Sequence, residues 1–204
     1  MTRPVRLEEP KGWWEGARGS RLGTLLILVL TGVLVVGAAA LVDRPKAGRA
    51  GVTPVNVSGS GLGPPPTIGR AAQDFTATTP DGQRISLSAL RGHPVWLTFG
   101  ASWCAQCQAE APDIEAAYEG HKASGVVVLA VFISEDSGTV RDYADRVGLR
   151  YLTVADPETR VASAYRVLGI PTHYFIDRSG VLRSIRTGSL TPQRMDAALA
   201  AISR

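Results

Sequence analysis

The sequence predicts an α/β fold, a sandwich formed by residues 67–204, and two observations support it. Short apolar runs of strand type alternate with segments of helical spacing, as in a parallel sheet that is covered by helices. One run, VVVLAVFI at 126–133, is apolar throughout, which is typical of a strand buried on both faces of a sheet. A segment of this length is large enough for one domain with its own core.

The predicted elements follow one another in order along this segment. FTATT and QRISL, separated by Pro80-Asp81-Gly82, predict an N-terminal β-hairpin. Asp156-Pro157 and Thr191-Pro192 each place a capping residue before a proline, which predicts the start of a helix. We expect the first of these two helices to reach about Val167. The remaining predictions are strands at 94–99, 126–133, 151–154 and on both sides of a turn at 177–180, and helices at about 104–119 and 140–147.

Residues 22–42 predict one transmembrane helix. They carry no charge, and as a helix they span roughly 32 Å, which matches a hydrocarbon core of about 30 Å. The flank 1–21 has five Lys and Arg residues against three in residues 43–66, which favours a cytoplasmic N-terminus and an extracytoplasmic domain. The alternative is a cleaved signal peptide that ends near Ala38-Ala39-Ala40. Its apolar region would be longer than the usual 7–15 residues or so, so we expect a retained anchor in the cell membrane.

Residues 43–66 predict a linker rich in Pro, Gly and Ser, without apolar periodicity. A flexible coil of this length has an end-to-end distance of roughly 25–30 Å, so we expect it to tether the domain near the membrane surface. The expected organisation is therefore a cytoplasmic flank at 1–21, an anchor at 22–42, the linker at 43–66 and one domain at 67–204.

The charge distribution argues against a nucleic-acid partner. The chain has a formal net charge of +4, but residues 67–204 hold 14 Lys and Arg against 14 Asp and Glu. The excess of positive charge flanks the predicted membrane segment, and the domain has none with which to attract phosphates.

The strongest functional signal is the pair Cys104 and Cys107, the only two cysteines of the chain. They lie where a strand is predicted to end and a helix to begin, so the free N–H groups and the dipole of the helix N-terminus would stabilise a thiolate. In such a pair the first thiol is exposed and attacks a disulfide, and the second, more buried thiol resolves the mixed disulfide. We therefore predict a redox-active pair.

Three other interpretations of the pair compete with this one. A structural zinc site needs four ligands, and the chain has no second cysteine pair. A purely structural disulfide would close a very small loop and stabilise little. Two reduced core cysteines remain an alternative, although Trp-Cys-x-x-Cys at a junction of strand and helix favours redox chemistry. We expect no bound metal and no cofactor.

The ordered segments DFTATTPDGQRISLSALRG, VWLTFGASWCAQC, VVVLAVFI and GIPTHYFIDRSG resemble thioredoxin-fold proteins of the membrane-anchored TlpA/ResA group. The resemblance covers about residues 70–204. It implies a thioredoxin-like three-layer sandwich with an N-terminal β-hairpin and a helix–strand insertion, preceded by the transmembrane helix. It further implies thiol–disulfide exchange with protein thiols or disulfides outside the cytoplasm, as a reductant or an oxidant, together with a membrane thiol-electron donor. Cytochrome c maturation is a frequent task of this group, in which the chain would act as a reductant of apocytochrome c.

The same resemblance implies a substrate-binding site beside the cysteines. Pro171 corresponds to a proline that is cis in this fold and faces the Cys pair. Because proline lacks an N–H, the backbone of the preceding Ile170 would be free to pair with an extended substrate. Trp103 is expected to shield the thiolate. An ordinary trans-proline at the start of a strand is the alternative for Pro171.

Glu110 follows Cys107 by three residues, on the same face of the predicted helix. The resemblance implies an acid near the thiols here, where a carboxylate would raise a thiol pKa and accept its proton. The alternative is a solvated surface glutamate. His173, two residues after Pro171, is either a base or copper ligand near the thiols or, as the sequence favours, a strand residue that faces elsewhere.

Two other functions share this fold. A thiol peroxidase of the peroxiredoxin type needs Thr or Ser three residues before its reactive cysteine, and Ala101 stands there for Cys104. A copper-binding chaperone would use Cys104, Cys107 and His173, although such proteins normally place three residues between the cysteines.

Overall fold

A computed structural model describes residues 21–42, 53–54 and 63–204. The chain divides into two compact units, Met1–Gly48 and Arg49–Arg204, and each is considered by itself. In the first unit, helix α1 (Arg21–Val42) covers the residues predicted to form the anchor. Among the described residues, no helix has both the length and the apolar character needed to cross a bilayer. Nearly all of the predicted flank 1–21 and most of the predicted linker 43–66 lie outside the described residues.

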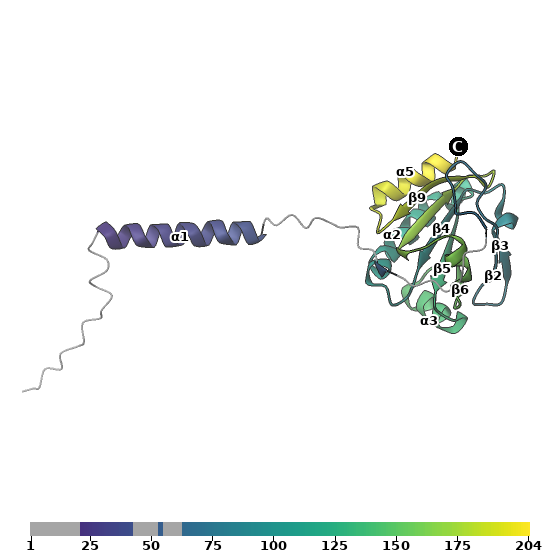
Figure 1. The fold of residues 1–204 in the computed structure, drawn as a ribbon, viewed down its shortest axis with the longest axis horizontal. Coiled ribbons are helices and arrows are strands. Elements are labelled where there is room, and N and C mark those ends of the chain that lie inside the picture. The colour runs from purple at the N-terminus through teal and green to yellow at the C-terminus, as the bar shows by residue number, and fades with distance from the viewer. Residues whose placement is uncertain (1–20, 43–52, 55–62) are drawn as a thin grey trace, which may run out of the picture. The chain divides into compact units, whose positions relative to one another are not determined.

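The second unit is built on a five-stranded sheet with the strand order β6-β5-β4-β8-β9 (Figure 1). Strands β4, β5 and β6 are parallel, and β8 and β9 continue the sheet in antiparallel pairing. This confirms the predicted parallel core with an antiparallel hairpin at its edge. The bounds of the sheet strands are β4 Val95–Gly100, β5 Val127–Ile133, β6 Leu152–Asp156, β8 Thr172–Ile176 and β9 Leu182–Thr187.

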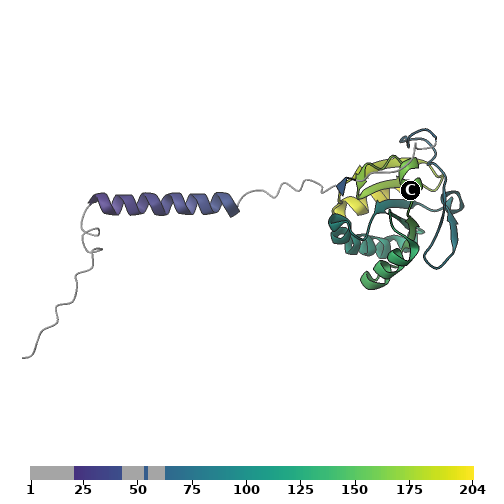
Figure 2. The same cartoon turned by 60° about the horizontal axis from the view of Figure 1, so that its bottom comes forward.

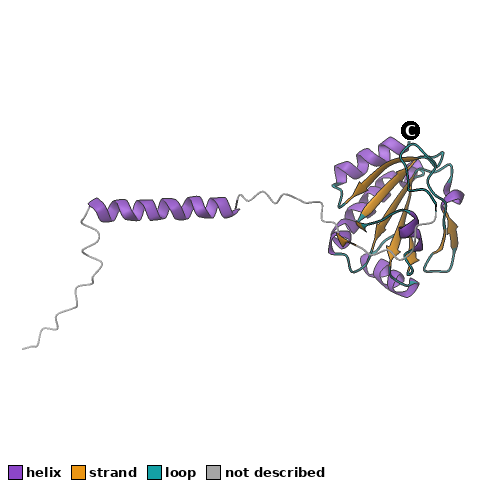
Figure 3. Cartoon of the chain, viewed as in Figure 1, coloured by secondary structure: helices purple, strands orange, loops and turns teal. Residues whose placement is uncertain are grey.

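The two faces of the sheet bury different cores, because successive side chains of a strand point to opposite sides. One core packs under three helices, α2 (Ala105–His121), α3 (Ser137–Val147) and α5 (Pro192–Ile202). The other packs under α4 (Arg160–Ala164) and an antiparallel hairpin of β2 (Thr76–Thr78) and β3 (Arg84–Ser86). In Figure 2, helices α2 and α3 lie on the opposite side of the sheet from the hairpin, and Figure 3 shows the strands between these layers.

Strand β4 shows how this alternation works. Leu97 and Phe99 belong to the core under the hairpin, and Trp96 belongs to the core under α2, α3 and α5. All three side chains are fully buried. β4 is therefore a central strand covered on both faces, and it ends directly before the Cys pair.

The start of α4 is where the sequence prediction was wrong. We expected Asp156-Pro157 to open a helix that reaches Val167, but the helix comprises only Arg160–Ala164. Asp156 is the last residue of β6, and its buried carboxylate accepts hydrogen bonds from the N–H groups of Val161 and Ala162 at 3.2 and 2.9 Å. The Asp156 carboxylate therefore does accept hydrogen bonds from the first turn of α4, but residues 157–159 form a turn between the acid and the helix. At Thr191-Pro192, by contrast, α5 begins at the proline as predicted.

A second departure from the prediction lies in the linker. The sequence predicts a flexible coil throughout 43–66, but Thr53–Pro54 form a short strand, β1. It pairs antiparallel with β7 (Gly169–Ile170), a two-residue strand that precedes β8. The pairing joins segments that lie far apart in the sequence, so local sequence gave no signal of it.

Candidate active site

The Cys pair lies at the N-terminus of α2, where strand β4 delivers the chain. Cys104 is the N-cap residue, and it forms a disulfide with Cys107 across a Cα–Cα distance of 5.2 Å. The sulfur of Cys104 also accepts a hydrogen bond from the N–H of Cys107 at 3.2 Å. When the disulfide is reduced, this N–H group and the helix dipole are placed to stabilise a thiolate on Cys104.

The relative exposure of the two sulfurs differs from the prediction. We expected Cys104 to be the exposed member of the pair, but its exposed fraction is 1%, and Cys107 is only partly buried. The hydroxyl group of Thr53 in β1 lies 3.7 Å from the Cys104 sulfur. The linker strand therefore covers the cysteine that sequence reasoning placed at the surface.

Glu110 lies one turn further along α2, and it is buried rather than solvated. Its Oε1 accepts a hydrogen bond from the backbone N–H of Leu190 at 2.6 Å, while its Oε2 has no partner among the described residues. Burial raises the pKa of Glu110 from 4.5 to about 7, against the opposing effect of the Leu190 hydrogen bond. The carboxyl group therefore changes its protonation state near neutral pH.

Glu110 and Cys107 line one small cavity, together with Gly100 and Pro171. Its volume of about 30 Å³ leaves room for one water molecule. A buried water needs polar partners, and the carboxyl group of Glu110 is one such group in the lining. Gly100 contributes to this space because it has no side chain: a Cβ atom there would lie 3.5 Å from the Cys107 sulfur. Cys107 and Glu110 are therefore exposed to one common space inside the domain.

As the sequence favoured, His173 is a strand residue, in β8, and its side chain faces this same acid. It is fully buried, and its Nε2 lies 3.4 Å from Oε1 of Glu110. Its Nδ1 accepts a hydrogen bond from the indole N–H of Trp96 at 3.3 Å and lies 3.0 Å from the Thr98 hydroxyl. An indole only donates, so the neutral imidazole carries its proton on Nε2, toward Glu110. Burial lowers the pKa of His173 to about 3, so the contact is not an ion pair near neutral pH.

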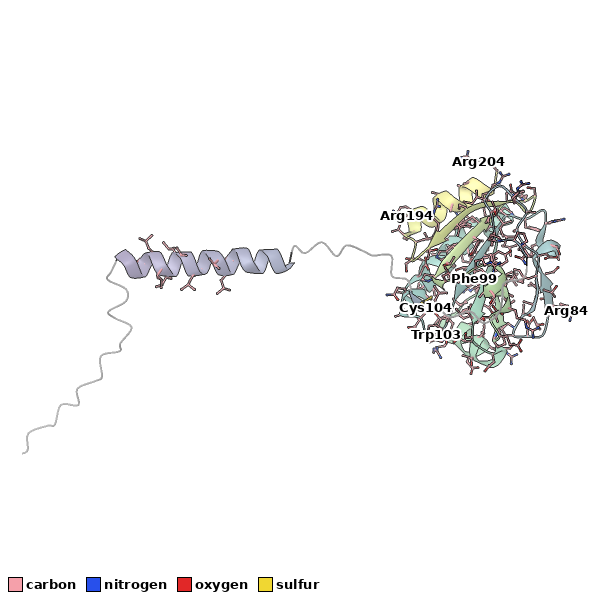
Figure 4. All side chains as sticks on the ribbon, viewed as in Figure 1. Arg84, Phe99, Trp103, Cys104, Arg194 and Arg204 are labelled. Atoms are coloured by element: carbon pink, nitrogen blue, oxygen red, sulfur yellow. A yellow bond between two sulfur atoms is a disulfide. The ribbon has the colours of Figure 1, made fainter. Side chains whose placement is uncertain are left out.

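The three residues predicted to bind substrate lie around the disulfide. The bond between Ile170 and Pro171 is cis, as the resemblance implies. Ile170 is buried and its backbone pairs with Thr53 of β1. Trp103, the residue before the buried Cys104, is half exposed, and Figure 4 labels both residues. The predicted site residues are thus brought together at one end of the sheet.

Sequence reasoning missed Glu135, which holds the loop before the disulfide. This buried acid follows β5 and accepts hydrogen bonds from the backbone N–H of Ser102 at 2.9 Å and from its hydroxyl group. The loop between β4 and Cys104 is thereby fixed to the neighbouring strand. An acid two residues after a fully apolar strand was the available signal, because parallel strands end at the same edge of a sheet.

No group of three or more His, Cys, Asp or Glu side chains in the described part of the chain is arranged to hold a metal ion. The copper hypothesis needs His173 beside the sulfurs. In the structure its Nδ1 is engaged by Trp96 and Thr98, and its Nε2 faces Glu110.

A disulfide at the start of a helix, beside a cis-proline and on a sheet of this order, defines a thioredoxin-fold thiol–disulfide oxidoreductase. Comparisons with known proteins agree. Residues 68–185 match the model of the AhpC/TSA family. The chain is 36% identical over 135 residues to the thiol-disulfide oxidoreductase ResA of Geobacillus kaustophilus, which covers 66% of this chain and 78% of that protein. ResA of Bacillus subtilis is 32% identical over 123 residues, which covers 60% and 69% of the two chains.

Among solved structures, a Chlorobium tepidum chain described as a putative thiol:disulfide interchange protein DsbE superposes with a TM-score of 0.64. It is 27% identical, and the match covers 68% of this chain and 99% of that one. The chain belongs to the AhpC/TSA family and is a thiol–disulfide oxidoreductase similar to ResA, with Cys104 and Cys107 as its redox pair.

Proposed function

We propose that the chain reduces disulfides of proteins outside the cytoplasm, with Cys104 as the attacking and Cys107 as the resolving thiol. The observation that carries this proposal is the position of the pair. Cys104 accepts a hydrogen bond at the N-terminus of α2, whereas Cys107 shares a cavity with a buried acid. The first environment favours a thiolate, and the second favours a thiol that needs a base.

The reaction proceeds in two exchanges. The Cys104 thiolate attacks one sulfur of the substrate disulfide, so that a mixed disulfide forms and the other substrate sulfur leaves as a thiolate. Cys107 then loses its proton and attacks the Cys104 sulfur. The enzyme disulfide forms, and the second substrate sulfur is released. Two electrons and two protons pass to the substrate in total, and a membrane thiol donor returns the pair to its reduced state.

Glu110 is proposed to accept the proton of Cys107, directly or through one water molecule in the cavity. A base works best when its pKa is near the pH of the reaction, and burial raises the pKa of Glu110 to about 7. The neutral His173 lies beside the same carboxyl group, with its Nε2 at 3.4 Å from Oε1, and fills the space that solvent would otherwise occupy there. The acid would thus be ionised often enough to take the proton and protonated often enough to return it.

Three further residues are proposed to bind the substrate. Ile170 offers backbone groups at the edge of β7, and Pro171 closes the far side of the Cys107 cavity without an N–H of its own. The half-exposed Trp103 supplies an apolar surface beside the sulfur. An extended polypeptide could lie across these residues.

The location and the natural substrate are part of the same proposal. Residues 22–42 would anchor the chain in the cell membrane with the N-terminus in the cytoplasm, because they lack charge and the preceding flank is the more basic one. The proposed substrate is apocytochrome c, reduced at its cysteines during cytochrome c maturation. The domain at 67–204 would then work at the outer surface.

The test uses the purified full chain in detergent, with insulin and a disulfide-containing apocytochrome c peptide as substrates. Cys104→Ser is expected to abolish exchange, whereas Cys107→Ser is expected to accumulate a mixed disulfide. Glu110→Gln should slow resolution by about a hundredfold, and Glu119→Gln, an exposed acid on the same helix, should not.

Three outcomes would count against the proposal. Unchanged exchange in both cysteine variants would exclude the pair as the reacting group. A reduction potential well above about −250 mV in a glutathione titration would indicate an oxidant and not a reductant. Consumption of hydrogen peroxide at a comparable rate would favour the thiol peroxidase instead.

A further inference from the structure

The attacking cysteine of the proposed reaction is covered in this structure, and the chain itself provides the cover. Cys104 is 1% exposed, although a thiol that attacks a protein disulfide must be reached from solvent. The Thr53 hydroxyl lies 3.7 Å from the Cys104 sulfur, and it also contacts the side-chain oxygen of Gln106 at 3.5 Å. A segment outside the predicted domain 67–204 therefore completes the surface around the disulfide.

The cover is a paired strand. In β1, Thr53 lies opposite Ile170 and Pro54 lies opposite Gly169, in antiparallel register. Among the described residues, β7 pairs with no other strand. A free strand edge is a template for pairing with any extended polypeptide, so β1 fills a position that would otherwise be open to another chain.

The opposite side of β7 is held from within the domain. The Gly169 carbonyl accepts a buried hydrogen bond from the hydroxyl of Thr172 at 2.6 Å, and the Pro171 carbonyl accepts one from the N–H of Gly188 at 2.8 Å. β7 therefore keeps its shape through contacts that do not involve β1. If β1 leaves, the same edge is available to a substrate.

We propose that Thr53–Pro54 occupies the site of the polypeptide substrate, with Thr53 in the place of the substrate cysteine, and that substrate must displace this strand to reach Cys104. The inference rests on the proposed function. Threonine is close to cysteine in size, and its Oγ1 is bonded to Cβ as the sulfur of a cysteine is. The Oγ1 of Thr53 therefore lies where the sulfur of a substrate cysteine would approach the Cys104 sulfur. Because the strand belongs to the same chain, it competes as an intramolecular ligand. The strand has only two residues, so an extended substrate that pairs over a longer stretch would displace it.

The placement is tested with a cysteine at position 53 in the full chain in detergent. In Thr53→Cys combined with Cys107→Ser, glutathione disulfide should oxidise the two remaining thiols to one intramolecular disulfide, while it is itself reduced to two glutathione molecules. Mass spectrometry of the peptides would identify the link to Cys104. The matched control is Thr67→Cys in the same background, at an exposed threonine that lies outside this contact.

The competition is tested with Thr53→Gly, which removes the side chain that covers the sulfur. In the reduced Cys107→Ser background, the alkylation rate of Cys104 by iodoacetamide should rise about three- to tenfold, because the hydroxyl contact with the sulfur is lost and a glycine also weakens the short strand. With Cys107 present, the KM for the cytochrome c peptide should fall by a similar factor. Thr67→Gly should change neither quantity.

The outcomes separate this inference from the proposed function. If Thr53→Cys links to Cys104 no faster than Thr67→Cys does, or if Thr53→Gly leaves alkylation and KM unchanged, the inference is overturned. The proposed function then still stands provided that Cys104→Ser abolishes exchange. If the link at position 53 forms rapidly but the wild-type chain exchanges with no polypeptide, the placement of Thr53 stands and the proposed function fails.

Discussion

Replacing Glu110 with Gln should stabilise the oxidised protein at high pH and leave it nearly unchanged at low pH. The pKa of this carboxyl group is 4.5 in the unfolded chain and about 7 in the folded one, because burial disfavours the charged form. Below about pH 4.5 the group is protonated in both states and has no effect. Between these two pKa values the unfolded state binds fewer protons than the folded state, so the free energy of unfolding falls as the pH rises.

The size of the effect follows from the same two values. Each tenfold change in proton affinity corresponds to about 1.4 kcal/mol, so the buried carboxylate destabilises the folded state by about 3 kcal/mol above about pH 7. Glutamine remains neutral, and its carbonyl can still accept the Leu190 hydrogen bond. The advantage of Glu110→Gln should therefore grow by about 3 kcal/mol between about pH 4 and pH 8.5.

Urea unfolding of oxidised residues 49–204 at a series of pH values measures this difference. Glu119→Gln is the matched control on the same helix, because Lys122 lowers the pKa of that exposed carboxyl group and its removal should give no gain at high pH. A difference between wild type and Glu110→Gln that does not vary with pH would refute the reasoning. It would mean that the pKa of Glu110 is the same in the folded and the unfolded protein.

Further predictions concern the groups around this acid and two hydrogen-bonded carboxylates. His173→Phe should leave the pKa of Glu110 at about 7, since burial is its main cause and the Nε2 of His173 makes no hydrogen bond among the described residues. NMR titration of the carboxyl carbon checks this, and a midpoint shifted by about one pH unit would contradict it. Asp156→Ala should destabilise the domain by about 1–3 kcal/mol in urea unfolding, with little change in exchange rate, because two buried N–H groups lose their acceptor. Glu135→Ala should release Ser102 and slow the attack by Cys104, and a loss of stability without any loss of rate would argue against this role.

The elements that sequence predicted well are those whose signals are local. The hairpin at Pro80-Asp81-Gly82, the start of α5 at Pro192 and the apolar run of β5 each depend on a few neighbouring residues. Asp156-Pro157 carried the same local signal as Thr191-Pro192, yet its helix begins at Arg160. The strand β6 continues through Asp156, so pairing within the sheet overrode the local preference for a helix start.

The sequence predicted the part of the candidate site that lies on one helix. It missed the contacts that form where strands distant in the sequence pair with each other. Cys104, Cys107 and Glu110 lie on α2 or at its start, and helical spacing alone relates them. His173 faces Glu110 only because β8 pairs with β4 in a register that sets it opposite Thr98. The burial of Cys104 depends on Thr53, which reaches it through a strand pairing that no local pattern encodes.

Gly100 offers a way to adjust this enzyme without touching any reacting group. Its backbone is not in the left-handed region, and the Cβ atom of an alanine would make only an ordinary contact, 3.5 Å from the Cys107 sulfur. Gly100 lines the same cavity as Cys107 and Glu110, so larger side chains at this position would take up part of its small volume. If that cavity carries the proton of the proposed reaction, a graded series of residues at position 100 would slow the activation of the resolving thiol step by step while every reacting group stays in place.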